Sequence, residues 1–159
     1  MTKARDITLT VNGEPIARTV PVRLNLVDFL RVELGLTGSH VGCEHGVCGA
    51  CTLEVDGKMV RGCLMLAVQA DGLAVITIEG LSTSGRLSAL QAAFHERNAL
   101  QCGYCTPGML ASAVEYIERV GAADRQAIRE HLSGNYCRCT GYQAIVDAVV
   151  DVIEGRAAS

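Results

Sequence analysis

Apolar and polar residues alternate near the beginning of the chain. Ile7, Leu9 and Val11 fall on one side of an extended segment whose other side carries polar residues. Alternation with a period of two is typical of a half-buried β-strand. The pair Asn12-Gly13 is a tight-turn signal, and residues 15–20 have the pattern of a returning strand. We therefore predict that the chain opens with a β-hairpin.

A short helix and further strands are predicted after this hairpin. Asn25 can cap the helix and Gly35 can end it, because apolar residues recur between them at helical spacing. Residues 37–51 are rich in Gly and Cys and have no period, which predicts a loop. Strands are predicted at 52–55, 58–60 and 74–78. Together these elements make a small mixed sheet crossed by one helix, which is the β-grasp arrangement.

The pattern changes from a period of two to a helical period around residues 80–85. We place a domain boundary at about residue 80, which divides the chain into domains 1–80 and 81–159. Four helices are predicted in the second domain, which suggests a compact four-helix bundle and an α+β fold class overall. Their signals are apolar spacing at Leu87, Leu90 and Phe94, an N-cap at Thr106 before Pro107, a cap at Asp124, and apolar spacing from about Gly141 to Ile153.

Composition limits the classes of function that the chain can have. Apolar residues make up 49% of the 159 residues, so a core can be buried, while the net charge of −3 and the scattered Lys and Arg give no footprint for nucleic acid. No apolar run approaches the ~18 residues that span a bilayer, and no secretory signal is visible. We therefore expect a cytoplasmic protein with no membrane partner. Its eight cysteines should then be reduced, and they fall into two groups of four, which suggests two sites.

The first group has a specific spacing. Cys43, Cys48 and Cys51 are separated by four and two residues, and Cys63 follows after eleven more. The first three match the spacing of plant-type [2Fe–2S] ferredoxins. An iron–sulfur cluster with four thiolates is anionic, so a loop that turns backbone N–H groups toward the sulfurs would offset its charge. Glycines that tolerate positive φ are suited to such a loop, and they occur at Gly42, Gly46 and Gly49.

The second group is less usual. Two residues separate Cys102 from Cys105, one separates Cys137 from Cys139, and 31 residues lie between the pairs. A structural zinc site more often has two-residue spacings in both pairs or adds histidines. Soft thiolates select both iron–sulfur clusters and zinc, so the spacing alone favours iron–sulfur and leaves zinc open. His45 is interpreted as a loop residue, because a Rieske site would replace two cysteines by two histidines.

Three stretches of the chain resemble the iron–sulfur subunit of the molybdenum hydroxylases, the xanthine oxidase family. They are GCEHGVCGACT at 42–52, QCGYCTPGM at 101–109 and NYCRCTGY at 135–142. The resemblance implies a ferredoxin-like β-grasp domain with a distal [2Fe–2S] cluster and a four-helix domain with a proximal one. It also implies a large subunit with molybdenum–molybdopterin cytosine dinucleotide and a medium subunit with FAD. We expect a heteromeric oxidoreductase, assembled as a dimer of heterotrimers.

The resemblance also implies a direction of electron flow, from molybdenum through the proximal and distal clusters to the flavin. Gln101 would hydrogen-bond the pterin, and Cys139 would ligate the proximal cluster on its pterin-facing side. Without the motif, Gln101 would be interpreted as a loop amide that caps a helix end. An aromatic CoA-ester reductase and a free-standing two-cluster carrier stay open as alternatives. No catalytic residue is expected in this chain, since the residues that select the substrate would belong to the large subunit.

Overall fold

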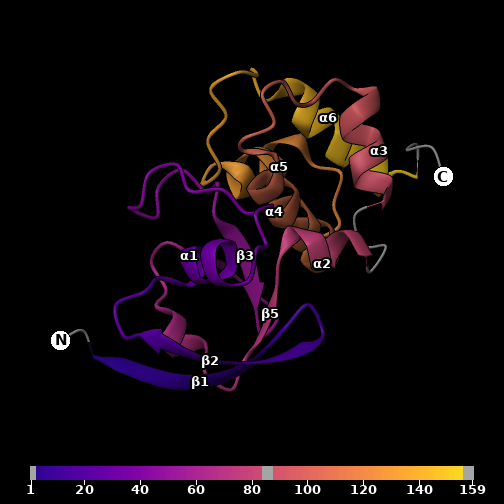
Figure 1. Ribbon diagram of the computed structural model, residues 1–159. Helices are drawn as coiled ribbons and strands as arrows, with labels where there is room; N and C mark the ends of the chain where they lie inside the picture. Colours follow the sequence, from indigo (N-terminus) through magenta and orange to yellow (C-terminus); the bar gives the residue numbers. More distant parts are fainter. Residues whose placement is uncertain (1–2, 84–87, 156–159) are drawn as a thin grey trace.

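The computed structural model describes residues 3–83 and 88–155, and they form an α+β architecture in two parts (Figure 1). The N-terminal part is a five-stranded sheet with a short helix, and the C-terminal part is helical. The elements in chain order are β1 (Ala4–Val11), β2 (Glu14–Pro21), α1 (Leu26–Asp28), η1 (Phe29–Glu33), β3 (Thr52–Val55), β4 (Lys58–Arg61), η2 (Ala67–Ala70), β5 (Ala74–Ile76), α2 (Ile78–Thr83), α3 (Ser88–Glu96), α4 (Thr106–Arg119), α5 (Arg125–Leu132) and α6 (Gln143–Ile153).

The sheet has the strand order β2-β1-β5-β3-β4. β1 pairs with β5 in parallel, and the other neighbours are antiparallel. Asn12 and Gly13 have φ values of 51° and 88°, as a tight hairpin turn between β1 and β2 requires. The predicted opening hairpin and the predicted mixed sheet are therefore confirmed.

The helix that crosses the sheet differs in one respect from the prediction. Asn25 caps it as expected, since the Asp28 N–H donates to Asn25 Oδ1 at 2.8 Å. However, the helical hydrogen bonding changes after α1, and η1 is a π-helical turn. Phe29 and Leu30 are fully buried in the core of the sheet domain, so the wider turn still places its apolar side chains inward.

The helical part contains a helix that the sequence pattern did not predict. α2 occupies Ile78–Thr83, where the end of a strand and a domain boundary were predicted, and β5 ends at Ile76 instead of residue 78. The cause is a contact from the opening hairpin: Asn12 Oδ1 accepts the Thr77 N–H at 2.9 Å, and Asn12 Nδ2 donates to Thr77 Oγ1 at 3.0 Å. Asn12 thereby fixes the point at which β5 ends and α2 begins.

The remaining helices follow the predicted apolar spacing. Asp124 caps α5 as expected, with its side chain accepting the Gln126 N–H at 2.8 Å. The predicted cap at Thr106 is wrong by one residue, because Cys105 is the N-cap of α4. Leu87 lies outside the described residues, and the division at residue 80, which falls within α2, stays a prediction.

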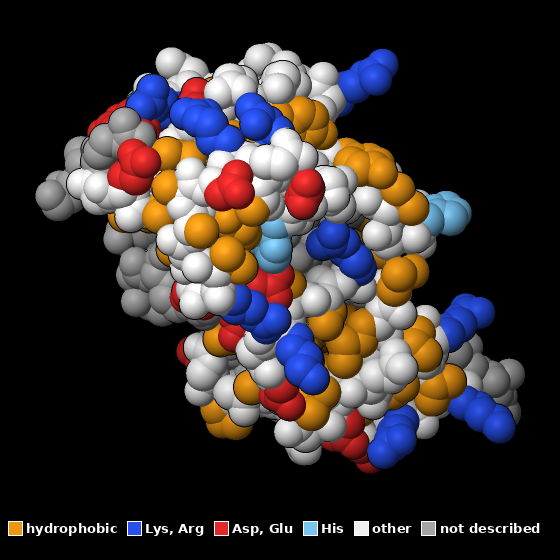
Figure 2. All heavy atoms as spheres, turned by 180° about the vertical axis from the view of Figure 1, so that it is seen from behind, with side chains coloured by type: hydrophobic (Ala, Val, Ile, Leu, Met, Phe, Trp, Pro, Cys, Tyr) orange, Lys and Arg blue, Asp and Glu red, His pale blue; other side chains and the backbone are white. Residues whose placement is uncertain are grey.

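Charged side chains are interspersed on the face seen in Figure 2, where Lys and Arg alternate with Asp, Glu and apolar side chains. No single basic field covers this face. Across residues 3–83 and 88–155, no helix combines the length and the hydropathy that crossing a bilayer requires.

Candidate metal centres

The first cysteine group lies mainly in the loop between η1 and β3. Its backbone turns at Gly46 and Gly49, whose φ values of +73° and +76° cost glycine little. The N–H groups of His45 and Cys48 point at Cys43 Sγ, each at 3.4 Å, as the expected offset of cluster charge requires. Gly42, in contrast, does not have a positive φ. Glycine is needed at this position because there is little room for a side chain: a Cβ at Gly42 would lie 3.1 Å from Cys48 Sγ.

Hydrogen bonding lowers the pKa of one thiol in this group, whereas burial raises the pKa of another. The N–H of Cys48, and then that of His45, lowers the pKa of Cys43 to about 6. Burial raises the pKa of Cys51 to about 11. The loop thus favours a thiolate at Cys43 on its own, whereas a thiolate at Cys51 needs a nearby cation to compensate for its desolvation.

The second group is assembled from two connections between helices. Cys102 and Cys105 precede α4, while Cys137 and Cys139 precede α6. Despite their distance along the chain, all four line one cavity of about 170 Å³. The structure therefore brings together the two pairs that the spacing singled out.

The two inner thiols of the second group also differ. Burial, and then a hydrogen bond with Cys137, raises the pKa of Cys105 to about 12. Burial acts to raise the pKa of Cys137 as well, but hydrogen bonds from the side chain and backbone of Thr140 outweigh it, and this pKa is lowered. The Thr140 N–H lies 3.4 Å from Cys137 Sγ. Each group thus has one thiol, Cys43 or Cys137, that is prepared to be a thiolate.

Gln101 lies on the exposed side of the second group. Its Nε2 donates to the Cys139 carbonyl oxygen at 2.9 Å, which ties the segment before α4 to the segment before α6. Cys102 and Cys139 are exposed, whereas Cys105 and Cys137 are half-buried. The open side of this group therefore presents a side-chain amide beside an accessible sulfur.

Both donor sets fit a two-iron cluster. Each iron of a [2Fe–2S] cluster takes two protein ligands, because bridging sulfides complete its coordination. A neighbouring cysteine contributes to each pKa shift in the first group, Cys48 at Cys43 and Cys63 at Cys51, so these thiols lie in two pairs. In the described part of the chain, no three His, Cys, Asp or Glu side chains converge as ligands of a single ion. Pairs of thiolates with inward N–H groups are the arrangement that an anionic two-iron cluster needs.

The proximity of the two groups was not predicted. The Tyr136 N–H donates to the Cys48 carbonyl oxygen at 2.8 Å, and Cys48 lines the same cavity as the second group. His40 of the first loop stacks on Tyr104 of the segment before α4, with ring centroids 4.5 Å apart. Apolar periods and cysteine spacings do not encode such contacts. Asn135 beside the second group is a polar residue that is buried, and this burial is visible only in the folded structure.

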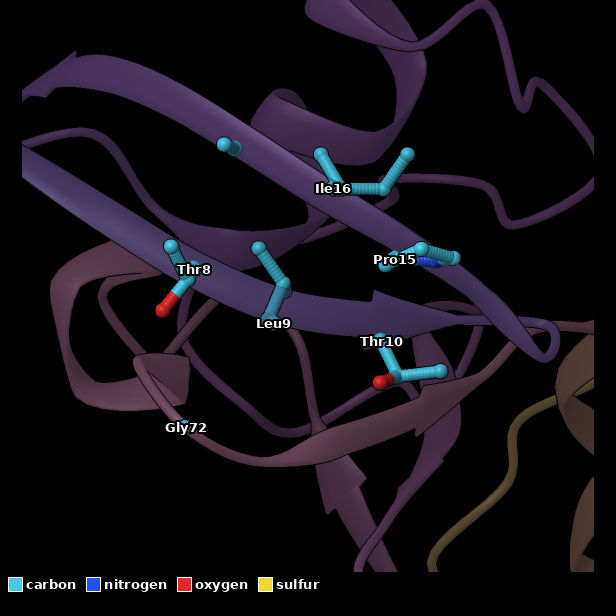
Figure 3. A pocket seen from close by; sticks show the side chains of 7 residues that line it. Thr8, Leu9, Thr10, Pro15, Ile16 and Gly72 are labelled. Atoms are coloured by element: carbon cyan, nitrogen blue, oxygen red, sulfur yellow. The ribbon is translucent and has the colours of Figure 1, made fainter.

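Another hollow of the described surface lies away from the cysteines. It has a volume of about 350 Å³ and follows the β1–β2 hairpin, where Thr8, Leu9, Thr10, Pro15 and Ile16 line it (Figure 3). None of its lining residues is titratable. This hollow therefore has no titratable side chain that could hold a metal ion.

Comparison with known families matches each half of the chain to an iron–sulfur domain. Residues 9–74 match a family described as a 2Fe-2S iron-sulfur cluster binding domain. Residues 77–150 match a family described as a [2Fe-2S] binding domain. The two matches cover the first and the second cysteine group respectively.

Several characterised proteins are similar over nearly the whole chain. Caffeine dehydrogenase subunit gamma from Pseudomonas sp. (strain CBB1) is 56% identical over 92% of this chain and 89% of its own length. Nicotine 6-hydroxylase small subunit from Paenarthrobacter nicotinovorans is 52% identical over 92% and 88%. A chain of quinoline 2-oxidoreductase from Pseudomonas putida 86 superposes with a TM-score of 0.90 at 49% identity, covering 96% of each chain.

Proposed function

The chain belongs to the iron–sulfur subunits of the molybdenum hydroxylases, and from this membership we propose that it carries electrons between a molybdopterin centre in one partner subunit and FAD in another. It is a subunit of an oxidoreductase complex and has two [2Fe–2S]-binding domains. The observation that carries the proposal is the contact between the two cysteine groups, one from each domain, at a common cavity.

Each cysteine group is proposed to hold one cluster. The support is the spacing of the cysteines, the pairing of neighbouring thiols and the inward N–H groups. The proposed ligands of the distal cluster are Cys43, Cys48, Cys51 and Cys63, and those of the proximal cluster are Cys102, Cys105, Cys137 and Cys139.

The N–H groups around the sulfurs would stabilise the negative charge of a bound cluster. When bound, a [2Fe–2S] cluster accepts and releases one electron at a time. The N–H groups of His45 and Cys48 stabilise charge at Cys43, and Thr140 does the same at Cys137. Because hydrogen bonds to sulfur and solvent access tune reduction potentials, these groups give the two sites separate control of potential.

The two loops are proposed to face different partners. Exposed Gln101 and Cys139 would meet the pterin, so that electrons arrive at the second group. Exposed apolar side chains lie at this group, with Val47 of the first loop at 51% and Leu64, which follows Cys63, at 62% exposure. Apolar side chains in such a position suit a protein interface, which we assign to the FAD subunit.

The relatives named above support a partner set and an oxidative reaction. Two of them are named as a subunit gamma and a small subunit, which supports assembly with further subunits rather than a free-standing carrier. We propose a large subunit with molybdenum–molybdopterin cytosine dinucleotide, a medium subunit with FAD, and a dimer of heterotrimers. Caffeine, nicotine and quinoline are nitrogen heterocycles, so we propose a substrate of that class for the large subunit.

Metal analysis and electron paramagnetic resonance of the purified complex test the cluster proposal. We expect about four iron and four sulfide per copy of this chain, because each [2Fe–2S] cluster holds two of each, and two distinguishable one-electron signals. Zinc in place of iron, or one signal after full reconstitution, would contradict it. Gln101→Ala should leave both signals intact and weaken retention of the molybdenum cofactor. Wild-type cofactor retention and turnover in that variant would argue against the pterin contact.

A further inference from the structure

The two cysteine loops are joined by a set of polar contacts that crosses between the two domains. We call this set the seam, and in Figure 1 the loop before β3 and the loop before α6 lie side by side there, in agreement with the hydrogen bond from the Tyr136 N–H to the Cys48 carbonyl. The residues of the seam are Cys48, Gly49, Thr52, Arg61, Gly108, Gly134, Asn135 and Tyr136.

Asn135 is at the centre of the seam. Its side chain is 2% exposed, and Nδ2 donates to the carbonyl oxygens of Gly108 at 3.0 Å and Gly49 at 3.2 Å. The same nitrogen lies 3.4 Å from Thr52 Oγ1, while Oδ1 accepts the Ser112 hydroxyl at 2.9 Å. A buried amide with partners on both of its ends is held in one orientation. Asn135 therefore fixes the first loop, β3 and α4 relative to one another.

The backbones at the seam touch directly. A Cβ on Gly108 would lie 2.1 Å from the Gly49 oxygen, and a Cβ on Gly49 would lie 2.5 Å from the Gly134 oxygen. Arg61 adds a second crossing, since its guanidinium donates to Thr52 Oγ1 and to the Gly134 oxygen, the latter at 2.9 Å. The position of one loop thus determines the position of the other.

The seam also contains a short bonded route between the two groups of proposed ligands. From Cys48 Sγ the route follows the bonds of Cys48 to its carbonyl, crosses one hydrogen bond of 2.8 Å to the Tyr136 N–H, and continues along the backbone to Cys137. Electron tunnelling weakens steeply with distance and passes more readily through bonds than through open space. The Cys48–Tyr136 hydrogen bond is therefore the one step of this route whose length depends on packing.

We propose that Asn135 is a positioning residue that holds the Cys48–Tyr136 hydrogen bond and thereby sets the rate of electron transfer between the two clusters. The inference rests on the proposed function, in which each cysteine group binds a cluster. One electron passes across the seam: the cluster at the second group is oxidised by one electron, the cluster at the first group is reduced by one, and no covalent bond forms or breaks. The neighbouring residue, Tyr136, contributes its backbone N–H to this route rather than its side chain.

The test is Asn135→Ala in the purified complex. Intercluster electron transfer is measured by rapid reduction, and the magnetic splitting between the two fully reduced clusters is measured by electron paramagnetic resonance. We expect full iron content and both individual signals, a several-fold lower rate, and a smaller splitting, because loss of the Asn135 contacts lets the Cys48–Tyr136 hydrogen bond lengthen. A wild-type rate and splitting at full iron content would overturn the proposal, because they would leave Asn135 with a purely structural role.

Two further variants control the test. Arg119 also joins the domains, donating to the Gly57 oxygen at 2.7 Å, but it lies away from the cysteine loops, so Arg119→Ala should leave the rate and the splitting unchanged. If Asn135→Ala does not assemble, Arg61→Met decides, with an expected slowing of the same electron transfer. A wild-type rate in iron-replete Arg61→Met would overturn the proposal. Absence of intercluster transfer in the wild-type complex would instead contradict the proposed function itself.

Discussion

The two cysteine groups meet similar chemical demands with different architectures. The first group lies almost entirely in one loop, residues 43–51, and is completed by Cys63 after the next hairpin. The second is assembled from the segments that precede α4 and α6, which only the packed helices bring together. The two groups also differ in solvent access. Cys51 of the first group is buried, whereas Cys102 and Cys139 of the second group are exposed.

This difference separates what local sequence determines from what tertiary packing determines. The first loop obtains its shape from glycines with positive φ and stabilises Cys43 with backbone N–H groups. The second group depends on the helical core and uses the hydroxyl of Thr140 as well as a backbone N–H at Cys137. We therefore expect changes in the first loop to act locally, and changes at the seam to affect both groups.

The largest effect is expected for Gly108→Ala. Alanine is favoured over glycine within a helix by about 1 kcal/mol, but here its Cβ would lie 2.1 Å from the Gly49 oxygen. Because both clashing groups belong to the backbone, the clash cannot be relieved by a rotamer change, and we expect a net loss of about 2–3 kcal/mol in the free energy of unfolding. Thermal unfolding measures the loss of stability, and electron paramagnetic resonance measures the two cluster signals, both of which should weaken.

Gly141→Ala is the matched control for this prediction. A Cβ at Gly141 would have open space around it, and its φ is not positive, so its effect should stay within about 0.5 kcal/mol. Equal stability of the two variants, or loss of one signal alone in Gly108→Ala, would break the view that the seam supports both groups.

A smaller and more local effect is expected for Gly46→Ala. Gly46 has a φ of +73°, where an L-residue costs about 1–2 kcal/mol, and its Cβ would lie 2.2 Å from Leu64 Cδ1. Gly57→Ala is a close control, because Gly57 has the same φ of +73° but open space around it. Both variants should lose similar stability, and only Gly46→Ala should reduce the iron bound by the first group. Loss of the second signal in Gly46→Ala would refute the local character of the first loop.

Local signals predicted the hairpin, the cysteine loop and the caps at Asn25 and Asp124, since each depends on residues close together in sequence. They did not predict α2, because Asn12 fixes its start across 65 positions of the chain. The π turn of η1 was missed for a related reason. Its apolar spacing is compatible with either kind of helix, and packing of Phe29 in the core decides between them.

The same distinction applies to the candidate sites. The eight cysteines as ligands and Gln101 as a pterin contact stay predictions, while the structure brings the four cysteines of the second group to one cavity and places Gln101 beside Cys139. The seam could not be predicted, because its contacts involve carbonyl oxygens that every residue has. The sequence shows two glycines and an asparagine at these positions, but only the packed domains define their burial and their partners.

The last prediction uses the different hydrogen-bond donors at Cys43 and Cys137. The donors to Cys43 are backbone N–H groups, which substitution of a side chain does not remove. At Cys137 the Thr140 side chain contributes, so Thr140→Val removes a donor that stabilises negative charge on that sulfur. A hydrogen bond to a charged group contributes about 1.5–3 kcal/mol, and for a one-electron couple 59 mV corresponds to a tenfold change in the equilibrium constant.

We therefore expect the reduction potential of the second cluster to fall by about 40–60 mV in Thr140→Val, because the reduced and more negative form loses more stabilisation than the oxidised form. Redox titration followed by electron paramagnetic resonance measures both potentials in one sample. His45→Ala is the control, because its backbone N–H at Cys43 is retained and the first potential should stay within about 10 mV. A shift of the first potential in Thr140→Val would mean that the seam transmits charge as well as position.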